Sequence, residues 1–434
     1  MTQGSASKLI EIERPPIIET AVVVRYADAS EPQYEVDESL AEIRRLAWTA
    51  GAEVACVIVQ RRARPCPRTL IGKGKLEQVK AACEELEARV VIFDCDLTPG
   101  QGANVEDAIG VKVVDRTQLI LDIFAQRART NEGKHQVELA QLNYMLPRLT
   151  GRGSVMRQQG GIGVRGPGEQ KLEVDRRVIR DRIGRLKGEL QTVRKNRQAQ
   201  RKRRATSGIP AVALVGYTNA GKSSLLNALT GADAFVEDKL FATLDPTTRR
   251  CTCPSGREVV FSDTVGFVRN LPHSLVAAFR ATLEEVNEAD LLLVVADASD
   301  PVVEDHIRTV FDVLDEIGVE DRPMLKVFNK TDVTAPNRVR QLLRNAGDAV
   351  AISARKGEGL EGLLRRVDTI LGAQRIRLQL RIPHSAGRLV ARIREAGAVY
   401  HQEYDGNDIL LDAEIPPALE SAVRPFAADA RGNA

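Results

Sequence analysis

Aromatic side chains and long apolar runs are both scarce in this chain of 434 residues. Aromatic residues make up 4% of it, whereas 43% of residues are hydrophobic and 28% are charged, a globular composition that excludes wholesale disorder. The longest apolar runs, such as residues 291–296, hold about six residues, whereas a membrane-spanning helix needs about 20. We therefore expect no transmembrane helix, and at about 150 residues per domain the length favours roughly three domains.

Cysteine is also sparse, and the first residues lack an apolar stretch. Six cysteines are too few for a disulfide framework in a chain of this length. The opening MTQGSASKLIEIERPP has no hydrophobic region of the kind that a secretory signal needs. Both features favour a reducing, cytoplasmic location. Cys251 and Cys253 form a CxC on an expected hairpin, where packing explains them better than metal binding.

The small net charge of +3 excludes a chain that is basic throughout, but the charge is unevenly distributed. Between Gln170 and Ala205 there are 14 Lys or Arg residues and 4 Asp or Glu residues, a local net charge of +10. A concentrated basic segment in an otherwise slightly acidic protein is typical of a contact with a polyanion. The alternative is a charged helix face that is merely solvated.

The order of apolar runs predicts a multidomain α/β protein. Residues 1–115 alternate strand and helix patterns, which favours a parallel sheet with crossover helices. Residues 206–372 repeat this alternation and form a P-loop GTPase (G) domain by the motifs described below. Residues 373–434 predict a small α+β domain, in which Asp405-Gly406-Asn407 is a good hairpin turn.

Residues 116–205 predict a long helical hairpin. Residues 116–149 are expected to be helical, and residues 151–168, with seven glycines, are expected to form the connecting loop. In the following segment Leu172, Ile179, Leu186 and Val193 recur every seven residues, with Ile183 and Leu190 between them, which predicts a heptad seam on a helix of about 35 residues. We expect this helix to pack against residues 116–149 in a chain that is monomeric when free; a homodimeric coiled coil is the alternative.

Residues 216–223, GYTNAGKS, match the phosphate-binding motif GxxxxGK[ST] between an expected strand and helix. Backbone N–H groups of such a loop hold phosphate oxygens, and Gly216 and Gly221 allow the close approach. Lys222 neutralises β- and γ-phosphate charge, and the Ser223 hydroxyl binds Mg²⁺.

Four further elements follow in the order that GTPases require. Thr243 of FATLD completes the Mg²⁺ shell when the γ-phosphate is present. Asp263 of DTVG holds Mg²⁺ through water, and the N–H of Gly266 senses the γ-phosphate. Asp332 of NKTD accepts hydrogen bonds from the guanine N1–H and 2-amino group, and the SAR turn at residues 353–355 meets guanine O6 through a backbone N–H.

These motifs define the candidate site. The predicted metal ligands are Ser223, Thr243 and Asp263, and the predicted catalytic residues are Lys222, Thr243, Gly266 and Asn219. The predicted GTP-binding residues are Gly216, Tyr217, Thr218, Asn219, Ala220, Gly221, Lys222, Ser223, Ser224, Phe241, Ala242, Thr243, Leu244, Asp245, Asp263, Thr264, Val265, Gly266, Asn329, Lys330, Asp332, Ser353, Ala354 and Arg355.

The chain resembles the HflX family of translation-factor-related GTPases. The resemblance is carried by residues 271–285, LPHSLVAAFRATLEE, and by GGIGVRGPGE at 160–169 followed by LEVDRR at 172–177, and it covers roughly residues 20–372. It implies a cytoplasmic GTPase that binds the large ribosomal subunit and can split ribosomes, notably under stress. The role of the C-terminal module is not implied, because that module varies in the family.

Three functional hypotheses compete on the sequence. The preferred one is a ribosome-associated GTPase that uses Mg²⁺ and acts on the large subunit. The second is a GTP-dependent RNA-modification or ribosome-assembly factor, and the third is an interaction scaffold. Outside the G domain there is no nucleophile, metal or folate signature, which favours the first.

Two finer expectations concern catalysis and RNA. Phe267 stands where many GTPases carry the Gln that orients water, so hydrolysis should be slow without a partner. Asn219 matches the P-loop Asn of K⁺-activated relatives, although an Asn that only shapes the loop is an equal alternative. The predicted RNA contacts, in and beside the glycine-rich loop, are Arg152, Arg157, Arg165, Arg176 and Arg177.

Overall fold

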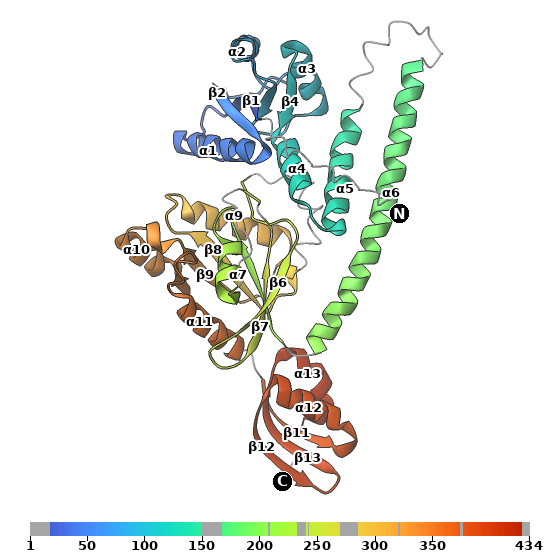
Figure 1. Ribbon diagram of the computed structural model, residues 1–434, viewed down its shortest axis with the longest axis vertical. Coiled ribbons are helices and arrows are strands. Elements are labelled where there is room, and N and C mark those ends of the chain that lie inside the picture. Colours follow the sequence, from blue (N-terminus) through green and yellow to red (C-terminus); the bar gives the residue numbers. More distant parts are fainter. Residues whose placement is uncertain are drawn as a thin grey trace, which may run out of the picture. The chain divides into compact units, whose positions relative to one another are not determined.

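A computed structural model describes residues 18–149, 167–206, 209–231, 240–241, 243–269, 285–319, 322–373 and 376–427. The chain divides into two compact units (Figure 1). The first comprises Met1–Ile123 with Pro147–Leu172, and the second comprises Phe124–Leu146 with Glu173–Ala434.

The first unit contains the predicted parallel sheet, in the strand order β2-β1-β3-β4. Its strands are β1 (Glu19–Ala27), β2 (Ala52–Arg61), β3 (Val90–Phe93) and β4 (Lys112–Asp115), and its crossover helices are α1 (Gln33–Ala50), α2 (Lys73–Glu85) and α3 (Pro99–Ile109). Consecutive β-branched side chains bury β1 on both faces, as expected for a strand inside a parallel sheet. The helices α2 and α3 contribute Val79 and Val105 to one of its core clusters.

The predicted continuous helix over 116–149 is wrong, because the structure breaks it into α4 (Arg116–Arg127) and α5 (Asn131–Arg148). The physical reason is Thr130, whose Oγ1 accepts a hydrogen bond from the N–H of Gly133 at 3.0 Å. A Thr hydroxyl at this position satisfies a donor of the first helical turn and starts a new helix. The apolar pattern continues across the break and therefore did not reveal it.

The next helix, α6 (Pro167–Thr206), begins two residues inside the segment that we predicted to be non-helical. Proline at the first position of a helix has no N–H to leave unsatisfied, so Pro167 is compatible with this start. The predicted loop residues 151–166 lie outside the described residues.

The two long helices pair in the middle of α6. Arg182 of α6 donates two hydrogen bonds to the Glu138 carboxylate of α5, at 2.7 and 2.8 Å. Ile183 and Leu186, both on the predicted heptad seam, are buried, whereas Ile179, Leu190 and Val193 are half-buried. The middle of the seam is therefore covered by contacts within one chain.

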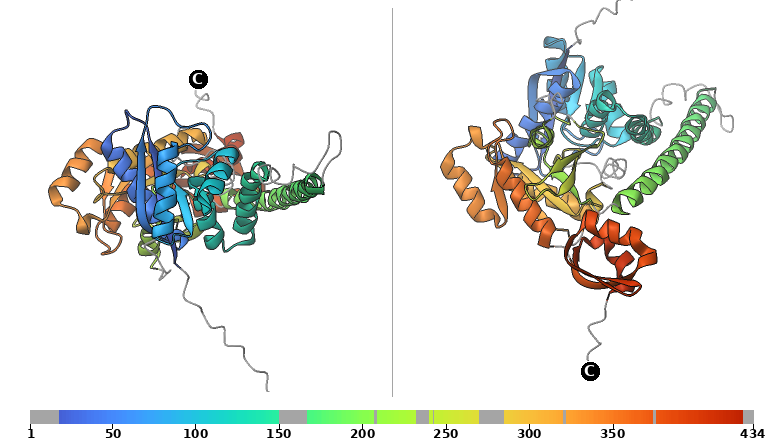
Figure 2. Two further views of the ribbon diagram at one scale, coloured as in Figure 1. Left: turned by 90° about the horizontal axis from the view of Figure 1, so that it is seen from above. Right: turned by 60° about the horizontal axis from the view of Figure 1, so that its bottom comes forward.

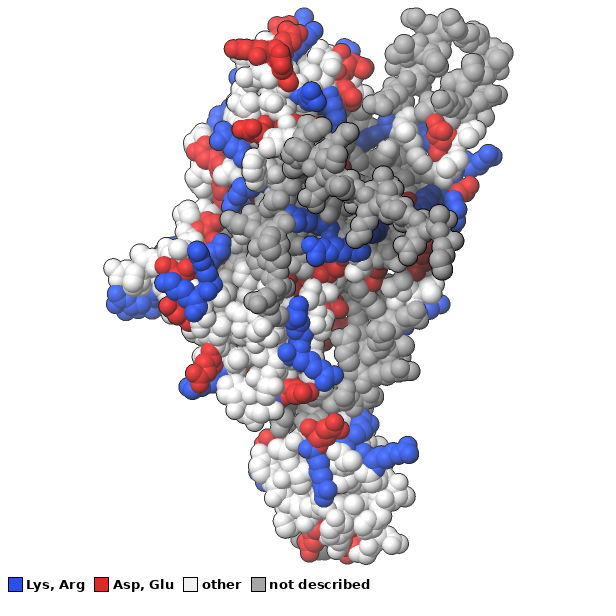
Figure 3. Space-filling view, in the orientation of Figure 1, with Lys and Arg blue, Asp and Glu red and all other residues white. Residues whose placement is uncertain are grey.

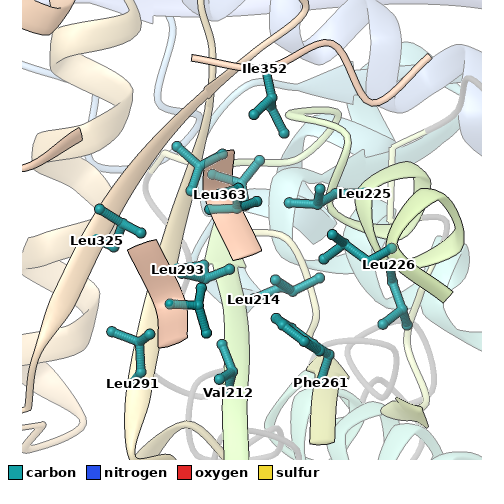
Figure 4. Close-up of a cluster of buried hydrophobic side chains, with 14 of the residues drawn as sticks. Val212, Leu214, Leu225, Leu226, Phe261, Leu291, Leu293, Leu325, Ile352 and Leu363 are labelled. Carbon is teal, nitrogen blue, oxygen red and sulfur yellow. The ribbon is translucent and has the colours of Figure 1, made fainter. Parts of the chain in front are cut away.

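The G-domain sheet has the order β10-β9-β8-β5-β7-β6, parallel except at the edge strand β6. Its strands are β5 (Ala211–Gly216), β6 (Thr247–Thr252), β7 (Glu258–Asp263), β8 (Leu291–Asp297), β9 (Met324–Asn329) and β10 (Ala349–Ala351), with helices α7 (Lys222–Thr230), α9 (Val303–Glu316), α10 (Pro336–Ala346) and α11 (Leu360–Ala373). Side chains from β5, β8 and α7, including Leu214, Leu293 and Leu225, meet in the buried cluster of Figure 4. This cluster supports the loops at the carboxyl ends of the strands.

The C-terminal module is a three-stranded antiparallel sheet, β11-β13-β12, with two helices (Figure 2). Its elements are β11 (Ile376–Pro383), α12 (Gly387–Ala396), β12 (Ala398–Asp405), β13 (Asp408–Ile415) and α13 (Pro417–Val423). The predicted hairpin turn is present, with Gly406 at φ 59° between β12 and β13. The module has its own buried cluster, which includes Leu380, Ile393 and Leu411.

No helix within the described ranges is long and apolar enough to cross a membrane. On the face drawn in Figure 3, basic and acidic side chains are interspersed over the described surface.

Candidate nucleotide-binding site

The P-loop lies between β5 and α7, at the carboxyl edge of the sheet. Gly216 and Gly221 have φ values of 156° and 90°, which favour glycine. A Cβ on Gly216 would collide with the carbonyl oxygen of Val295, and one on Gly221 with the side-chain amide of Asn329. Both predicted glycines are therefore required by the packing of the loop.

Lys222, at the first position of α7, is buried beneath this loop. Its Nζ donates to the carbonyl oxygens of Gly216 at 3.0 Å and Tyr217 at 2.9 Å. Loss of hydration lowers the pKa of the ammonium group to about 8. A buried ammonium group of this kind favours an anionic ligand, because nearby negative charge would stabilise its protonated form.

The three predicted metal ligands are together. Asp263 Oδ2 accepts hydrogen bonds from Ser223 Oγ at 2.6 Å and Thr243 Oγ1 at 2.8 Å, and the two hydroxyl oxygens are 2.8 Å apart. Burial raises the pKa of Asp263, and its Oδ1 has no hydrogen-bond partner among the residues that the structure describes. Such a set of hard oxygen atoms with one unsatisfied carboxylate oxygen fits Mg²⁺.

The DTVG segment is fastened to the P-loop by backbone hydrogen bonds. The N–H of Phe267 donates to Gly216 at 3.1 Å, and the N–H of Thr218 donates to Phe267 at 2.8 Å. A Cβ on Gly266 would lie 2.8 Å from the Cα of Thr218 and 3.0 Å from Lys222 Nζ. The backbone of Gly266 thus lies beside the lysine, where the predicted γ-phosphate contact requires it.

Sequence reasoning missed one support of this region. The hydroxyl of Tyr217 accepts a hydrogen bond from the N–H of Arg269 at 2.9 Å, and its ring stacks on His306 of α9 at 3.8 Å. His306 is more than 80 residues away in the chain, and no motif marks it. Thr264 and Val265 are buried, and Thr264 Oγ1 donates to the Leu214 carbonyl at 2.7 Å.

Asn219 is half-buried and has φ 62°, in the left-handed region that Asn tolerates better than most residues. This conformation is compatible with an Asn that shapes the loop, one of the two alternatives that the sequence leaves open. Ala220 is buried, and Ser224 is half-buried on α7.

The predicted base-binding residues also converge. Asn329 joins two loops, because its Nδ2 donates to Ala220 and its Oδ1 accepts from the N–H of Ala354, both at 3.0 Å. Ser353 Oγ donates to Asp332 Oδ1 at 2.8 Å, and this hydrogen bond lowers the pKa of Asp332.

Lys330 and Arg355 are less buried than the other predicted base-binding residues Asn329, Ser353 and Ala354. Lys330 has φ 63° and pairs with Asp297 at 2.7 Å. Arg355 is exposed.

Thr243 and Asp245 of the FATLD segment contact different parts of the structure. Thr243 faces Asp263, whereas the Asp245 carboxylate accepts hydrogen bonds from the backbone N–H groups of Arg129 and Thr130, each at 2.9 Å. Phe241 and Leu244 are buried, and Ala242 lies outside the described residues. Thr130 is a second residue that the motifs did not reveal.

The predicted RNA contacts are only partly described. Arg152, Arg157 and Arg165 lie outside the described residues. On α6, Arg176 is half-buried and Arg177 is exposed. Within the described residues no group of three or more His, Cys, Asp or Glu side chains gathers as a metal cluster. Cys251 packs on α7 with its Sγ donating to the Leu229 carbonyl at 3.2 Å, and Cys253 is buried in the core.

Comparisons with known proteins match three successive parts of the chain. Family models described as "GTP-binding GTPase N-terminal", "GTP-binding GTPase Middle Region" and "50S ribosome-binding GTPase" match residues 37–125, 127–204 and 211–330. The GTPase HflX of Caldanaerobacter subterraneus subsp. tengcongensis is 48% identical over 394 residues, covering 90% of this chain and 91% of the relative. The GTPase HflX of Escherichia coli (strain K12) is 44% identical over 384 residues, covering 87% and 90%.

A solved structure is also similar. It is a GTP-binding protein from the archaeon Sulfolobus solfataricus in complex with GDP, with 26% identity and a TM-score of 0.43. The match covers 81% of this chain and 98% of that one.

Proposed function

This chain belongs to the HflX family of GTPases, and on that premise we propose that its GTP cycle drives the splitting or rescue of ribosomes through the large subunit. GTP binding and hydrolysis are properties of the family, and the G domain is of the ribosome-binding type. The proposal adds what the cycle accomplishes, and it implies a cytoplasmic location because ribosomes are there.

The roles of the site residues belong to this proposal. Lys222 binds β- and γ-phosphate oxygens, Gly266 donates its N–H to the γ-phosphate, and Asp332 selects guanine. Ser223, Thr243 and Asp263 would hold Mg²⁺, which when bound neutralises phosphate charge. The observation that carries these roles is the convergence of Ser223, Thr243 and Asp263 within 2.8 Å of one another.

The ribosomal RNA contact is assigned to α6 and the glycine-rich loop that precedes it. The described part of α6 exposes Arg177, Arg180, Arg185, Lys187 and Lys195 beside the seam that packs on α5. Cations on one helix neutralise phosphates and release counterions. The loop residues Arg152, Arg157 and Arg165 would enter RNA cavities, since glycine-rich backbone with Arg side chains suits phosphate pairing and base stacking.

Co-sedimentation with 70S ribosomes and separate subunits, with GDP or a non-hydrolysable GTP analogue, tests the proposal. We expect the GTP-analogue form to bind the large subunit tightly and to reduce the 70S fraction. Binding to immature subunits alone would favour a role in assembly, and an altered RNA nucleotide would favour modification.

A variant in which residues 151–166 are replaced by a short neutral linker tests the loop, because α6 begins at Pro167 and stays intact. It should bind GTP as the parent does but lose tight large-subunit binding and splitting. A matched control replaces only Arg152, Arg157 and Arg165 by Lys, which keeps the charge and should retain most binding if charge alone matters. If the linker variant splits ribosomes as well as the parent at matched salt, the loop is not the contact.

A further inference from the structure

The Asp245 carboxylate binds the two residues that precede α5. Its Oδ2 accepts hydrogen bonds from the N–H groups of Arg129 and Thr130 at 2.9 Å, and its Oδ1 accepts one from Thr130 Oγ1 at 2.5 Å. Negative charge at a helix N-terminus is stabilised by the unsatisfied N–H groups and the helix dipole. The acceptor comes from more than 100 residues away, so this cap is a tertiary contact between the G domain and the helical segment.

The approach of the two segments is close enough to restrict residue type. A Cβ on Gly133, in the first turn of α5, would collide with Asp245 Oδ1. Thr130 Oγ1 also accepts from the N–H of Gly133, so one hydroxyl serves both the helix and the carboxylate.

The helical segment also contacts Phe241, the first residue of the FATLD motif. The ring of Phe241 meets the ring of Phe124 edge to face, with centroids 4.6 Å apart, and both side chains are fully buried or nearly so. Leu244 is buried as well. Thr243 therefore lies between two anchors, Phe241 and Asp245, both attached to residues 124–130.

We propose that Thr130 is a positioning residue for GTP hydrolysis: with Asp245 it holds Thr243 against Asp263 and Ser223, and so ties the start of α5 to the γ-phosphate-bound state. The inference deepens the proposed role of Thr243 and does not depend on the ribosome. Because coupling between two sites is reciprocal, occupancy of the γ-phosphate site should also order the start of α5.

A purely structural cap predicts something different. A capping Thr stabilises its helix whether GDP or GTP is bound, and its loss would lower stability without changing the need for metal. A positioning contact instead affects the state in which Thr243 binds Mg²⁺, so its loss should raise the Mg²⁺ requirement of the GTP-analogue complex and leave GDP affinity unchanged.

The experiment compares the full-length parent with Thr130→Val, Asp245→Asn and the double variant. We expect the Mg²⁺ concentration for half-maximal GTP-analogue binding to rise about tenfold, and kcat to fall by a similar factor, because hydrogen bonds to a charged acceptor are lost. GDP affinity should stay within about twofold. Since the two residues act through one contact, the double variant should be little worse than the worse single one.

Thr98→Val is the matched control. Thr98 Oγ1 accepts from the N–H of Gln101 as the N-cap of α3, so the variant loses the same kind of cap in the other unit. It should lower thermal stability without changing the Mg²⁺ requirement. If Thr130→Val behaves as Thr98→Val does, the contact is only a cap and the proposal is wrong.

Gly133→Ala covers the case in which Thr130→Val or Asp245→Asn fails to fold. Alanine favours a helix more than glycine does, so α5 itself should be no weaker. Its methyl group would nevertheless displace the Asp245 carboxylate, and kcat should fall although the helix remains.

Hydrogen exchange supplies a readout that does not depend on activity. In the parent, the GTP analogue should slow exchange at the amides of Arg129 and Thr130 relative to GDP, and Asp245→Asn should abolish the difference. Equal exchange of these amides with both nucleotides in the parent would overturn the proposal.

Discussion

Selection of guanine is predicted to depend on one carboxylate, that of Asp332. Ser353 Oγ donates to Oδ1 and lowers the pKa of the carboxyl group, so the acid stays ionised and ready to accept from guanine. Asp332→Asn should weaken GTP binding about 100-fold, because two hydrogen bonds to a charged acceptor are lost. It should improve binding of xanthosine triphosphate, whose base has a carbonyl at the 2-position.

Fluorescence titration of the full chain with both nucleotides measures this exchange of specificity. Asp348→Asn is a suitable control, since Asp348 pairs with Arg366 on the surface. Equal affinity of the parent for GTP and ATP at this site would contradict the assignment.

Phe267 and Asn219 lead to two predictions about the rate of GTP hydrolysis. Phe267 is buried and cannot orient water, so steady-state hydrolysis should be slow alone and faster with ribosomes. If Asn219 helps to bind K⁺, replacing Na⁺ by K⁺ should accelerate hydrolysis. Asn219→Gly is a better test than Asn219→Ala, because glycine adopts φ 62° without strain, so the loss of the side chain is not confused with strain in the backbone.

The comparison of Asn219→Gly with the parent in both salts decides between the two roles. Loss of the K⁺ effect with stability retained would support ion binding. An equal rate in Na⁺ and K⁺, unchanged by the substitution, would leave Asn219 only its role in the loop.

The residues that sequence reasoning identified share a property: each belongs to a short motif whose chemistry fixes its spacing. Asp263 and Asn329 end strands β7 and β9, and Lys222 begins the helix that follows β5; parallel strands bring their carboxyl ends to one edge. Thr130 and His306 belong to no such motif, and their partners Asp245 and Tyr217 are more than 80 residues away in the chain. Long-range contacts of this kind depend on packing that local patterns do not encode.

At the level of elements, the α5–α6 pairing predicts a dependence on pH. The hydrogen bond from Arg182 lowers the pKa of Glu138, so its stabilising effect is present above the unfolded pKa of about 4.3 and is lost as the pH falls through the folded value. Both side chains are more than a third exposed, so Arg182→Met should lower the free energy of unfolding only slightly at pH 7.

Urea unfolding of the parent and Arg182→Met at pH 7 and near pH 3 measures the effect. The two proteins should differ at pH 7 and converge in acid. Arg185→Met, on an exposed position of the same helix, should match the parent at both values. A difference that persists in acid would mean that the aliphatic part of Arg182 matters more than its charge.

Elements with strong periodicity were predictable and their interruptions were not. The heptad of α6 was read correctly because Ile183 and Leu186 repeat a buried face. The break at residues 128–130 was missed, because the apolar pattern continues on both sides of it. The hydrogen bond to the Thr130 hydroxyl nevertheless starts a new helix there.

For the whole molecule, the C-terminal module is predicted to be dispensable for nucleotide binding. Its core is formed by its own strands and helices, with Leu380, Ile393 and Leu411 among its members. A chain ending at Ala373 should bind GTP within about twofold of the parent, because core clusters that share no side chains contribute independently. Isothermal titration measures this, and a large loss of affinity would show that the module supports the G domain.

Asn329 has a consequence for the whole protein. One side chain joins the phosphate loop at Ala220 to the base-binding turn at Ala354. This contact lies on the parts of the proposed site that GDP and GTP would share, so it should support the binding of both nucleotides equally. The fraction of molecules that carry GTP would then follow the ratio of GTP to GDP in the cell, and the protein would respond to the energy supply as it changes.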